Sequence, residues 1–187
     1  MSRAYRIRVA ESLRRHVQVE DGISGALELL PILTRERMAE ILAGALAQRG
    51  FERQGNTAVR TEADGAVISI DLETAEVTIR LADEKPIALE LERTAAAGEG
   101  QQAATEERLR AQLVRELEQS AAAEERELQR EVTARLTARL REVTPELDAV
   151  VNRVTAEALK VKAGELGTIE SISEDPETGS MTIKVRV

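Results

Sequence analysis

Residues 128–161 read LQREVTARLTARLREVTPELDAVVNRVTAEALKV, and the spacing of their apolar side chains decides the fold. Ten apolar positions recur with a mean spacing of about 3.67 residues, the period of an eleven-residue repeat in a nearly straight α-helix. They are Leu128, Val132, Leu136, Leu140, Val143, Leu147, Val151, Val154, Ala158 and Val161. An isolated helix cannot bury such a stripe, so the pattern predicts packing on the chain itself or on a partner.

The same helical pattern extends over residues 105–165, and we expect this region to form a long helical arm. At a rise of 1.5 Å per residue, roughly 60 helical residues would span about 90 Å. Thr144 followed by Pro145 is a helix-start signal, an N-cap with proline at the first helical position, so we predict a break near Pro145. The continuous phase of the stripe across Pro145 favours a kink over a reversal.

Residues 1–94 alternate between apolar and polar side chains in a way that predicts a small, mostly antiparallel sheet. Between its strands, Thr34 as N-cap and Gly50 as left-handed C-cap enclose one helix, with Phe51 placed to pack back on the helix end. Asp64-Gly65 is a strong hairpin signal between the strand patterns of residues 57–62 and 66–72. The pattern therefore indicates an α+β domain with one packed helix.

Two further segments complete the predicted organisation. Residues 95–104 are rich in small side chains and are expected to form a linker. Residues 166–187 alternate around a turn and predict a β-hairpin. Because a lone hairpin is marginal in water, we expect it to rejoin the sheet of residues 1–94, which makes the helical arm an insertion before a C-terminal hairpin.

Composition excludes several classes of site. The chain has no cysteine and one histidine, His16, so a metal site with nitrogen or sulfur ligands is not expected. Nucleotide-binding glycine motifs do not occur, and we predict no cofactor. No stretch of 18 uncharged apolar residues exists and the N-terminus lacks a signal-peptide pattern, so we expect a cytoplasmic protein without a membrane span.

Two alternative functions depend on charged residues. A net charge of −8 argues against non-specific nucleic-acid binding, although a basic patch could form near the N-terminus. The arginines of that patch are Arg3, Arg6, Arg8, Arg14 and Arg15. Asp71 and Glu73 are two apart on a strand pattern and could serve a hydrolase as a carboxylate pair, although flanking solvated charges explain them better.

Both ends of the chain resemble a known family. The segments are AYRIRVAESLRRHVQVEDG at residues 4–22, ELLPIL at 28–33 and ALKVKAGELGTIESISEDPETGSMTIKVRV at 158–187. They are similar to small accessory proteins of bacterial FtsH-type AAA+ ATPase ternary systems, and the ending is also similar to a small cyanobacterial and plastid family. The first resemblance implies action with an AAA+ ATPase and other partners in conflict or stress responses. It assigns no role to any residue.

The sequence thus favours a non-enzymatic interaction or scaffold protein over a hydrolase or a nucleic-acid binder. We expect a homo-oligomer or a complex with protein partners, assembled through the helical arm. The interacting residues predicted from the stripe are Leu128, Val132, Leu136, Leu140, Val143, Leu147, Val151 and Val154.

Overall fold

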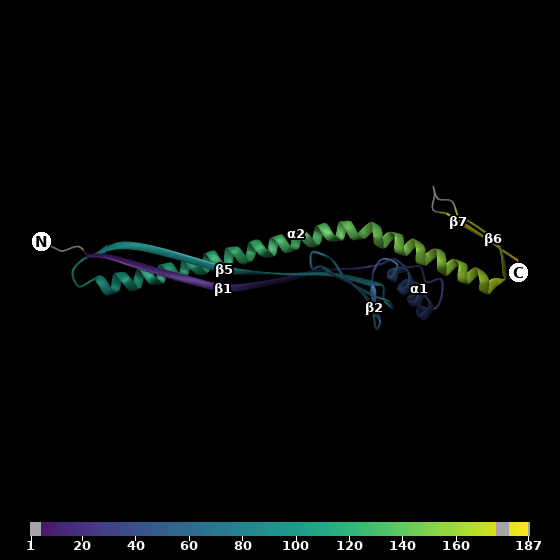
Figure 1. Ribbon diagram of the computed structural model, residues 1–187, viewed down its shortest axis with the longest axis horizontal. Coiled ribbons are helices and arrows are strands. Elements are labelled where there is room, and N and C mark those ends of the chain that lie inside the picture. Colours follow the sequence, from purple (N-terminus) through teal and green to yellow (C-terminus); the bar gives the residue numbers. More distant parts are fainter. Residues whose placement is uncertain (1–4, 175–179, 187) are drawn as a thin grey trace. The chain divides into compact units, whose positions relative to one another are not determined.

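The computed structural model describes residues 5–174 and 180–186 and has the predicted α+β fold (Figure 1). The elements are β1 (Tyr5–Ala26), α1 (Arg35–Ala47), β2 (Glu52–Gln54), β3 (Thr57–Thr61), β4 (Val67–Asp71), β5 (Glu76–Ala97), α2 (Gln102–Leu166), β6 (Thr168–Glu174) and β7 (Met181–Arg186). The first five strands form one antiparallel sheet in the order β1-β5-β4-β3-β2, and β6 pairs with β7 in a second sheet.

The chain divides into two compact units. The first unit comprises Met1–Asp21 and Ala82–Ala134, and the second comprises Gly22–Leu81 and Arg135–Val187. Strands β1 and β5 and helix α2 therefore contribute residues to both units. The predicted linker is shorter than residues 95–104, because β5 continues to Ala97 and α2 begins at Gln102.

In the first unit, residues 5–21 of β1 and 82–97 of β5 form a ribbon against residues 102–134 of α2. Val9 of β1 and Leu109 and Leu113 of α2 are the buried centre of this contact. Ion pairs join the helix to the ribbon around that centre, among them Lys85–Glu124 at 2.7 Å and Arg93–Glu116 at 2.9 Å. The apolar face of the ribbon thus packs on the apolar stripe of α2 in this unit. This contact was not predicted from the sequence.

In the second unit, strand register places apolar side chains on one face of the sheet. Ala58 pairs with Ile70, and Ile68 pairs with Ile79, so these four residues share a face, and all are buried. The turn between β3 and β4 is the predicted one, since Gly65 has a φ of 84° and its N–H donates to the Glu62 carbonyl at 3.0 Å. Local turn chemistry therefore fixes the register of this hairpin.

Helix α1 has the predicted ends. Thr34 occupies the N-cap position, and its carbonyl accepts the first helical hydrogen bond, from Met38 N–H at 2.9 Å. At the other end Gly50 has a φ of 80°, and the N–H of Phe51 donates to the Leu46 carbonyl at 3.2 Å. This is a Schellman motif, and Phe51, which is 5% exposed, is its apolar contact.

The predicted end of one helix before Pro145 and start of a second at it are wrong, because α2 is a single helix with Pro145 inside it; the favoured kink stays a prediction. Thr144 is a helical residue rather than an N-cap, and its hydroxyl donates to the Leu140 carbonyl at 2.7 Å. Val143 and Leu147 flank the proline and are both buried, so packing on either side outweighs the lost hydrogen bond.

The last hairpin forms a sheet of its own among the described residues, so its predicted return to the first sheet is wrong. The five-stranded sheet has its edges at β1 and β2, whereas α2 ends beside α1, where Glu165 pairs with Arg37. The chain then turns at once into the hairpin. A Cβ on Gly167 would collide with the backbone of Arg186, so glycine is required at this junction.

Two arginine–carboxylate contacts hold α2 on the sheet of the second unit. Arg60 of β3 makes two parallel bonds to Glu146, at 2.8 and 2.9 Å, and Arg139 of α2 reaches Asp64 at 2.8 Å. The hydrogen bond from Arg60 lowers the pKa of Glu146 below its ordinary value, and the bond from Arg139 does the same for Asp64. Both carboxylates therefore stabilise the fold only while they are ionised.

The lowered pKa values of Glu146 and Asp64 predict that the fold loses stability in acid. A carboxyl whose pKa is lower in the folded chain stabilises the fold above its unfolded pKa, about 4, and this stability is lost as pH falls through the folded value. We expect the free energy of unfolding, measured in urea at a series of pH values, to be flat near neutral pH and to fall below about pH 5. Glu146→Gln should make that fall shallower, and an unchanged slope would contradict the assignment.

Candidate interaction surface

The stripe predicted to bind a partner lies mainly in the core. Six of its eight proposed interacting side chains are buried, namely Leu128, Val132, Leu136, Val143, Leu147 and Val154. Leu140 and Val151 are half-buried. The physical reason is that β1 and β5 are each 22 residues long and offer α2 a long sheet surface on which to pack. A surface open to a partner must be sought elsewhere.

The connection between β1 and α1 leaves apolar side chains exposed in the second unit. The last sheet contact of this segment is the Leu27 N–H, which donates to the Ala75 carbonyl at 2.9 Å. Two tight turns follow, with Leu29 N–H donating to the Leu27 carbonyl and Ile32 N–H to the Leu30 carbonyl, each at 2.9 Å. Leu30 is 60% exposed as a result. The ELLPIL run thus crosses to α1 without being buried.

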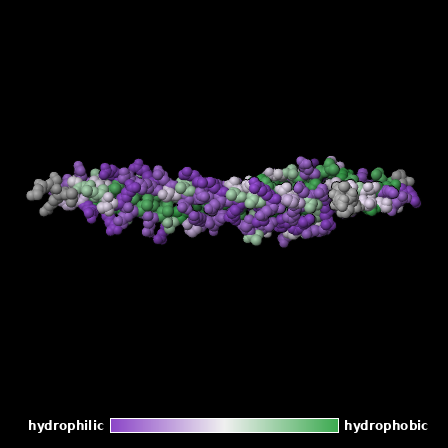
Figure 2. Space-filling model, turned by 90° about the horizontal axis from the view of Figure 1, so that it is seen from above, coloured by the Kyte–Doolittle hydropathy of each residue, from purple (hydrophilic) through white to green (hydrophobic). Residues whose placement is uncertain are grey.

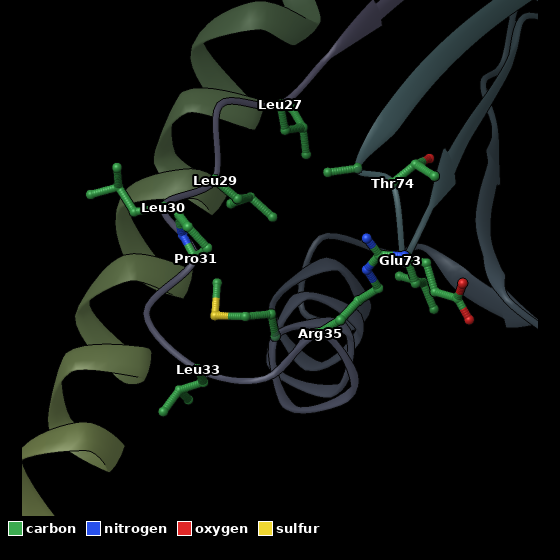
Figure 3. A pocket seen from close by; sticks show the side chains of 11 residues that line it. Leu27, Leu29, Leu30, Pro31, Leu33, Arg35, Glu73 and Thr74 are labelled. Atoms are coloured by element: carbon green, nitrogen blue, oxygen red, sulfur yellow. The ribbon is translucent and has the colours of Figure 1, made fainter.

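A hollow of about 220 Å³ lies between this connection, the start of α1 and the turn between β4 and β5 (Figure 3). Its walls are mainly apolar and include Leu27, Leu29, Leu30, Pro31, Leu33 and Met38. Arg35 reaches from α1 toward the turn that carries Glu73 and Thr74 (Figure 3). The hollow is therefore apolar in its walls and charged at its rim.

A second hollow of about 410 Å³ shares Leu33 with the first. Ile41 of α1 and Val161 of α2 contribute its other apolar side chains, and Val161 is 39% exposed. We name the two hollows together the Leu30 surface, defined by Leu27, Leu29, Leu30, Pro31, Leu33, Met38, Ile41 and Val161. Val161 is the last of the ten apolar positions of the stripe, and there the stripe reaches the surface.

The charged groups around the Leu30 surface include both signs, with a slight excess of carboxylates. They are Glu28, Glu36, Glu40, Glu73 and Glu165 against Arg35, Arg37, Arg53 and Lys162, and Arg53 binds Glu40 at 2.9 Å. The Glu36 backbone N–H and the Thr34 hydroxyl lower the pKa of the Glu36 carboxyl. Lys162 and, more weakly, Arg37 lower the pKa of the Glu165 carboxyl. Glu40 and Glu165 are therefore paired with basic side chains.

The carboxylates proposed for a hydrolase have a structural role at the turn between β4 and β5. One oxygen of Asp71 accepts backbone N–H bonds from Glu73 at 2.9 Å and Thr74 at 2.8 Å. These bonds lower the pKa of the Asp71 carboxyl, the Thr74 N–H most strongly. Glu73 is exposed at the rim of the first hollow. Asp71 therefore stabilises the turn between β4 and β5.

The N-terminal arginines are partly neutralised in the first unit. Arg8 contacts Glu92 at 2.5 Å, and Arg15 lies 3.8 Å from Glu118. Arg3 is outside the described residues. His16 approaches Glu84 at 3.1 Å on the same exposed ribbon, as expected for an ordinary surface histidine.

Within residues 5–174 and 180–186, no group of three or more histidine, aspartate or glutamate side chains is arranged to hold a metal ion. The same residues include no helix long and apolar enough to cross a membrane.

Comparison with known families gives a match along the whole chain. The model of the FtsH ternary system domain X5 matches residues 1–187. The chain belongs to this family. The match confirms the resemblance of the two chain ends, and it is consistent with an accessory role in an FtsH ternary system. No curated protein and no solved structure matches the chain.

Sequence reasoning noticed the ELLPIL run but not its part in a surface. Its apolar residues and Pro31 are visible as a signal, but apolar runs before a helix are usually buried. Only the three-dimensional arrangement of α1, α2 and the β4–β5 turn leaves Leu30 outside the core.

Proposed function

We propose that this protein is a non-enzymatic interaction subunit of an FtsH ternary system, and that the Leu30 surface binds its partner. The proposed occupant is an apolar segment of the AAA+ ATPase of the same system, flanked by basic residues. The exposure of Leu30 at 60% beside two apolar hollows is the observation that carries this assignment. Family membership supplies the class of partner.

The energetics of the surface support docking. Full burial of one leucine side chain is favourable by about 1.5–3 kcal/mol, and isolated exposed leucines contribute none of this to the fold. A partner that covers Leu30 and fills the two hollows would gain this energy at several side chains. Clusters of this kind, at the centre of an interface, supply most of its binding energy.

The charge pattern supports the basic flanks of the occupant. The chain has a net charge of −8, and carboxylates slightly outnumber basic side chains around the hollows. Lysine or arginine beside the apolar anchors would match that potential, accelerate association and reject acidic competitors. Binding should accordingly weaken as ionic strength rises.

Capture of the ATPase from the native host tests the proposal. Tagged wild-type protein should retain the AAA+ ATPase, identified by mass spectrometry, whereas Leu30→Glu should reduce its recovery at least about tenfold, equivalent to roughly 1.4 kcal/mol. Because Leu30 is mostly exposed, this substitution should leave the circular dichroism spectrum unchanged. Val67→Glu is the matched control, since Val67 is 36% exposed on β4 and lies outside the Leu30 surface.

Two results would count against the proposal. Equal recovery with wild type and Leu30→Glu would place the interface elsewhere on the chain. Failure of the wild type to retain any AAA+ ATPase, with the chain folded and abundant, would remove the partner assignment.

A further inference from the structure

Strand β1 is a long edge strand. It is the outermost strand of its sheet, so its side away from β5 has no neighbouring strand among the described residues. β1 is 22 residues long, whereas strands in globular proteins usually have about 3–10 residues. Residues 5–21, which belong to the first unit, contain no proline, so every one of them has a backbone N–H. Such an edge can accept a further strand.

The outer edge of β5 is less suited to strand addition. In the first unit this edge is also open, because the pairing of β5 with β4 ends at Arg80. Pro86, however, lies within β5. Proline occurs in edge strands with its missing N–H directed away from the neighbouring strand, so it interrupts the outer edge of β5.

The side chains of β1 alternate between two faces over residues 5–21. All even-numbered residues are exposed, whereas odd-numbered residues lie on the face that α2 covers. Ile7 and Val9 belong to the apolar cluster with Leu109 and Leu113 on that face. A strand added to this edge must alternate in the same way, with one face toward the helix and the other toward solvent.

Residues 5–21 are self-complementary in an antiparallel pair. If two copies of β1 pair with Leu13 opposite Leu13, residues at equal distances from Leu13 lie opposite each other on one face of the sheet. On the α2 side, apolar residues then face apolar residues and an acid faces a base: Ile7 faces Val19, Val9 faces Val17 and Glu11 faces Arg15. On the other face Arg6 faces Glu20, and no two like charges are directly opposed.

Other registers lose this match. A shift by two residues is the smallest that keeps α2 on the same face in both copies. In one direction it places Glu11 opposite Leu13 and Val9 opposite Arg15. In the other direction it places Glu11 opposite Val17 and Leu13 opposite Arg15. The pairing centred on Leu13 is therefore favoured over its neighbours.

Helix α2 has a symmetric row of side chains at the same level. Arg110 reaches Glu11 at 2.8 Å, and Glu118 lies 3.8 Å from Arg15. Arg110, Val114 and Glu118 follow one another at intervals of four residues, so they form one row on the side of α2 toward β1. Val114 is therefore level with the centre of the β1 pairing, which lies midway between Glu11 and Arg15.

Val114 is exposed on that side of the helix. It is 44% exposed, and no large apolar side chain among the described residues of the first unit is more exposed. Figure 2 shows the surface of this part of the chain as mainly purple and hydrophilic, with smaller green, apolar areas. The other side of α2 lies toward β5, where Glu116 pairs with Arg93 and Glu124 with Lys85. Val114 thus lies beside the open edge of β1.

We propose that a second copy of this chain pairs with β1 along its open edge, about a two-fold axis at Leu13. The two ribbons then form one continuous antiparallel sheet with both α2 helices on the same face. Neighbouring strands lie about 4.8 Å apart, so two adjacent two-stranded ribbons place their helices about 10 Å apart. Helices pack at about 8–10 Å, so Val114 meets Val114 of the second copy, and Arg110 faces its Glu118.

Symmetry is what identifies the occupant as a second copy. Pairing with an unrelated strand requires no symmetry in β1, whereas apolar, acidic and basic positions here are matched about Leu13 in the strand and about Val114 in the helix. Residues 5–21 carry four arginines against three carboxylates, so two copies meet at a nearly neutral segment of a chain whose net charge is −8. These residues are separate from the Leu30 surface, so the dimer is independent of the proposed function.

Sedimentation analysis of the purified full chain over a range of concentrations tests the dimer. Wild type should shift from monomer to dimer as concentration rises. Arg6→Glu places like charges opposite each other at two symmetric positions, and Glu20→Arg does the same, so each should weaken dimerisation at least about tenfold. Both side chains are exposed on the outer face, so circular dichroism should show an unchanged fold.

Mixing the two charge variants is the most specific measurement. In a mixed dimer of Arg6→Glu with Glu20→Arg, opposite charges again face each other at both positions. The mixture should therefore dimerise like wild type although neither variant does so alone. The double variant Arg6→Glu/Glu20→Arg should also regain the dimer, because each copy then supplies both reversed charges.

Val114→Lys tests the helix contact. It brings two lysines together at the axis and should weaken dimerisation at least about tenfold. Ala123→Lys is the matched control, because Ala123 is exposed and lies about two and a half helical turns further along, on the opposite side of α2. This control should dimerise like wild type.

Several outcomes would overturn the dimer. A wild type that stays monomeric throughout the range does so, as does a dimer that both charge variants retain. A mixture of the charge variants that stays monomeric excludes the pairing centred on Leu13. Normal dimerisation of Val114→Lys excludes an axis beside Val114. Leu30→Glu should dimerise normally, and its failure to do so would contradict the separation of the two surfaces.

Discussion

Replacing Leu136 by alanine is expected to lower the free energy of unfolding of the second unit by about 2–5 kcal/mol, the usual cost of a leucine removed from a core. Leu136 is 1% exposed and lies in the middle of the stripe on α2. Truncation removes burial and leaves a cavity beside side chains that cannot fully collapse into it. Chemical unfolding followed by circular dichroism measures the change, and the transitions of the two units must be fitted separately if they do not coincide.

Leu140→Ala is the matched control, because Leu140 belongs to the same stripe but is only half-buried. Its substitution should cost clearly less. The opposite pattern would be informative: if Leu136→Ala left unfolding unchanged and instead abolished association with a partner, the stripe would be an interface. That is the role that the sequence pattern alone predicts for it.

The sequence predicted well those parts of the fold that depend on near neighbours. The two ends of α1 follow from Thr34 and Gly50, and the β3–β4 turn follows from Asp64 and Gly65. Each of these features is determined by the φ preference or side-chain hydrogen bonding of one or two residues. They form the same way wherever the segment is placed.

The errors all concern contacts between distant segments. The alternation in residues 1–94 did not predict the length of β1 and β5, which are each 22 residues long because they pair with each other. Pro145 does not end its helix, because Val143 and Leu147 are anchored in the core on either side of it. The same long-range packing buried the predicted interaction residues and left Leu30 exposed. Periodicity identifies an apolar face but not what covers it.

Arg60→Ala is expected to destabilise the second unit by about 2–3 kcal/mol, somewhat less than the 3–5 kcal/mol typical of breaking a fully buried ion pair. The Arg60 side chain is 18% exposed and that of Glu146 is 24% exposed, so solvent screens the pair only in part. Arg60 also donates from Nε to Glu62 at 2.8 Å and lies 4.4 Å from the centre of the Phe51 ring. Its removal leaves Glu146 and the Phe51 ring without this partner, and it leaves Glu62 with only the longer contact to Arg139 at 3.9 Å.

A double-mutant cycle separates the Arg60–Glu146 interaction from the other contacts of Arg60. Glu146→Ala and the double variant, unfolded in the same way, should give a coupling energy of about 0.5–3 kcal/mol, because the second substitution removes a charge already unpaired. Arg60→Lys keeps the charge but cannot make the two parallel bonds, so it should recover only part of the loss. Additive single effects would mean that the Arg60–Glu146 pair does not help to hold α2 on this sheet, which would leave the apolar stripe and the Arg139–Asp64 contact to do so. In that case the acid sensitivity expected of Glu146 should also disappear, so the two measurements test the same contact independently.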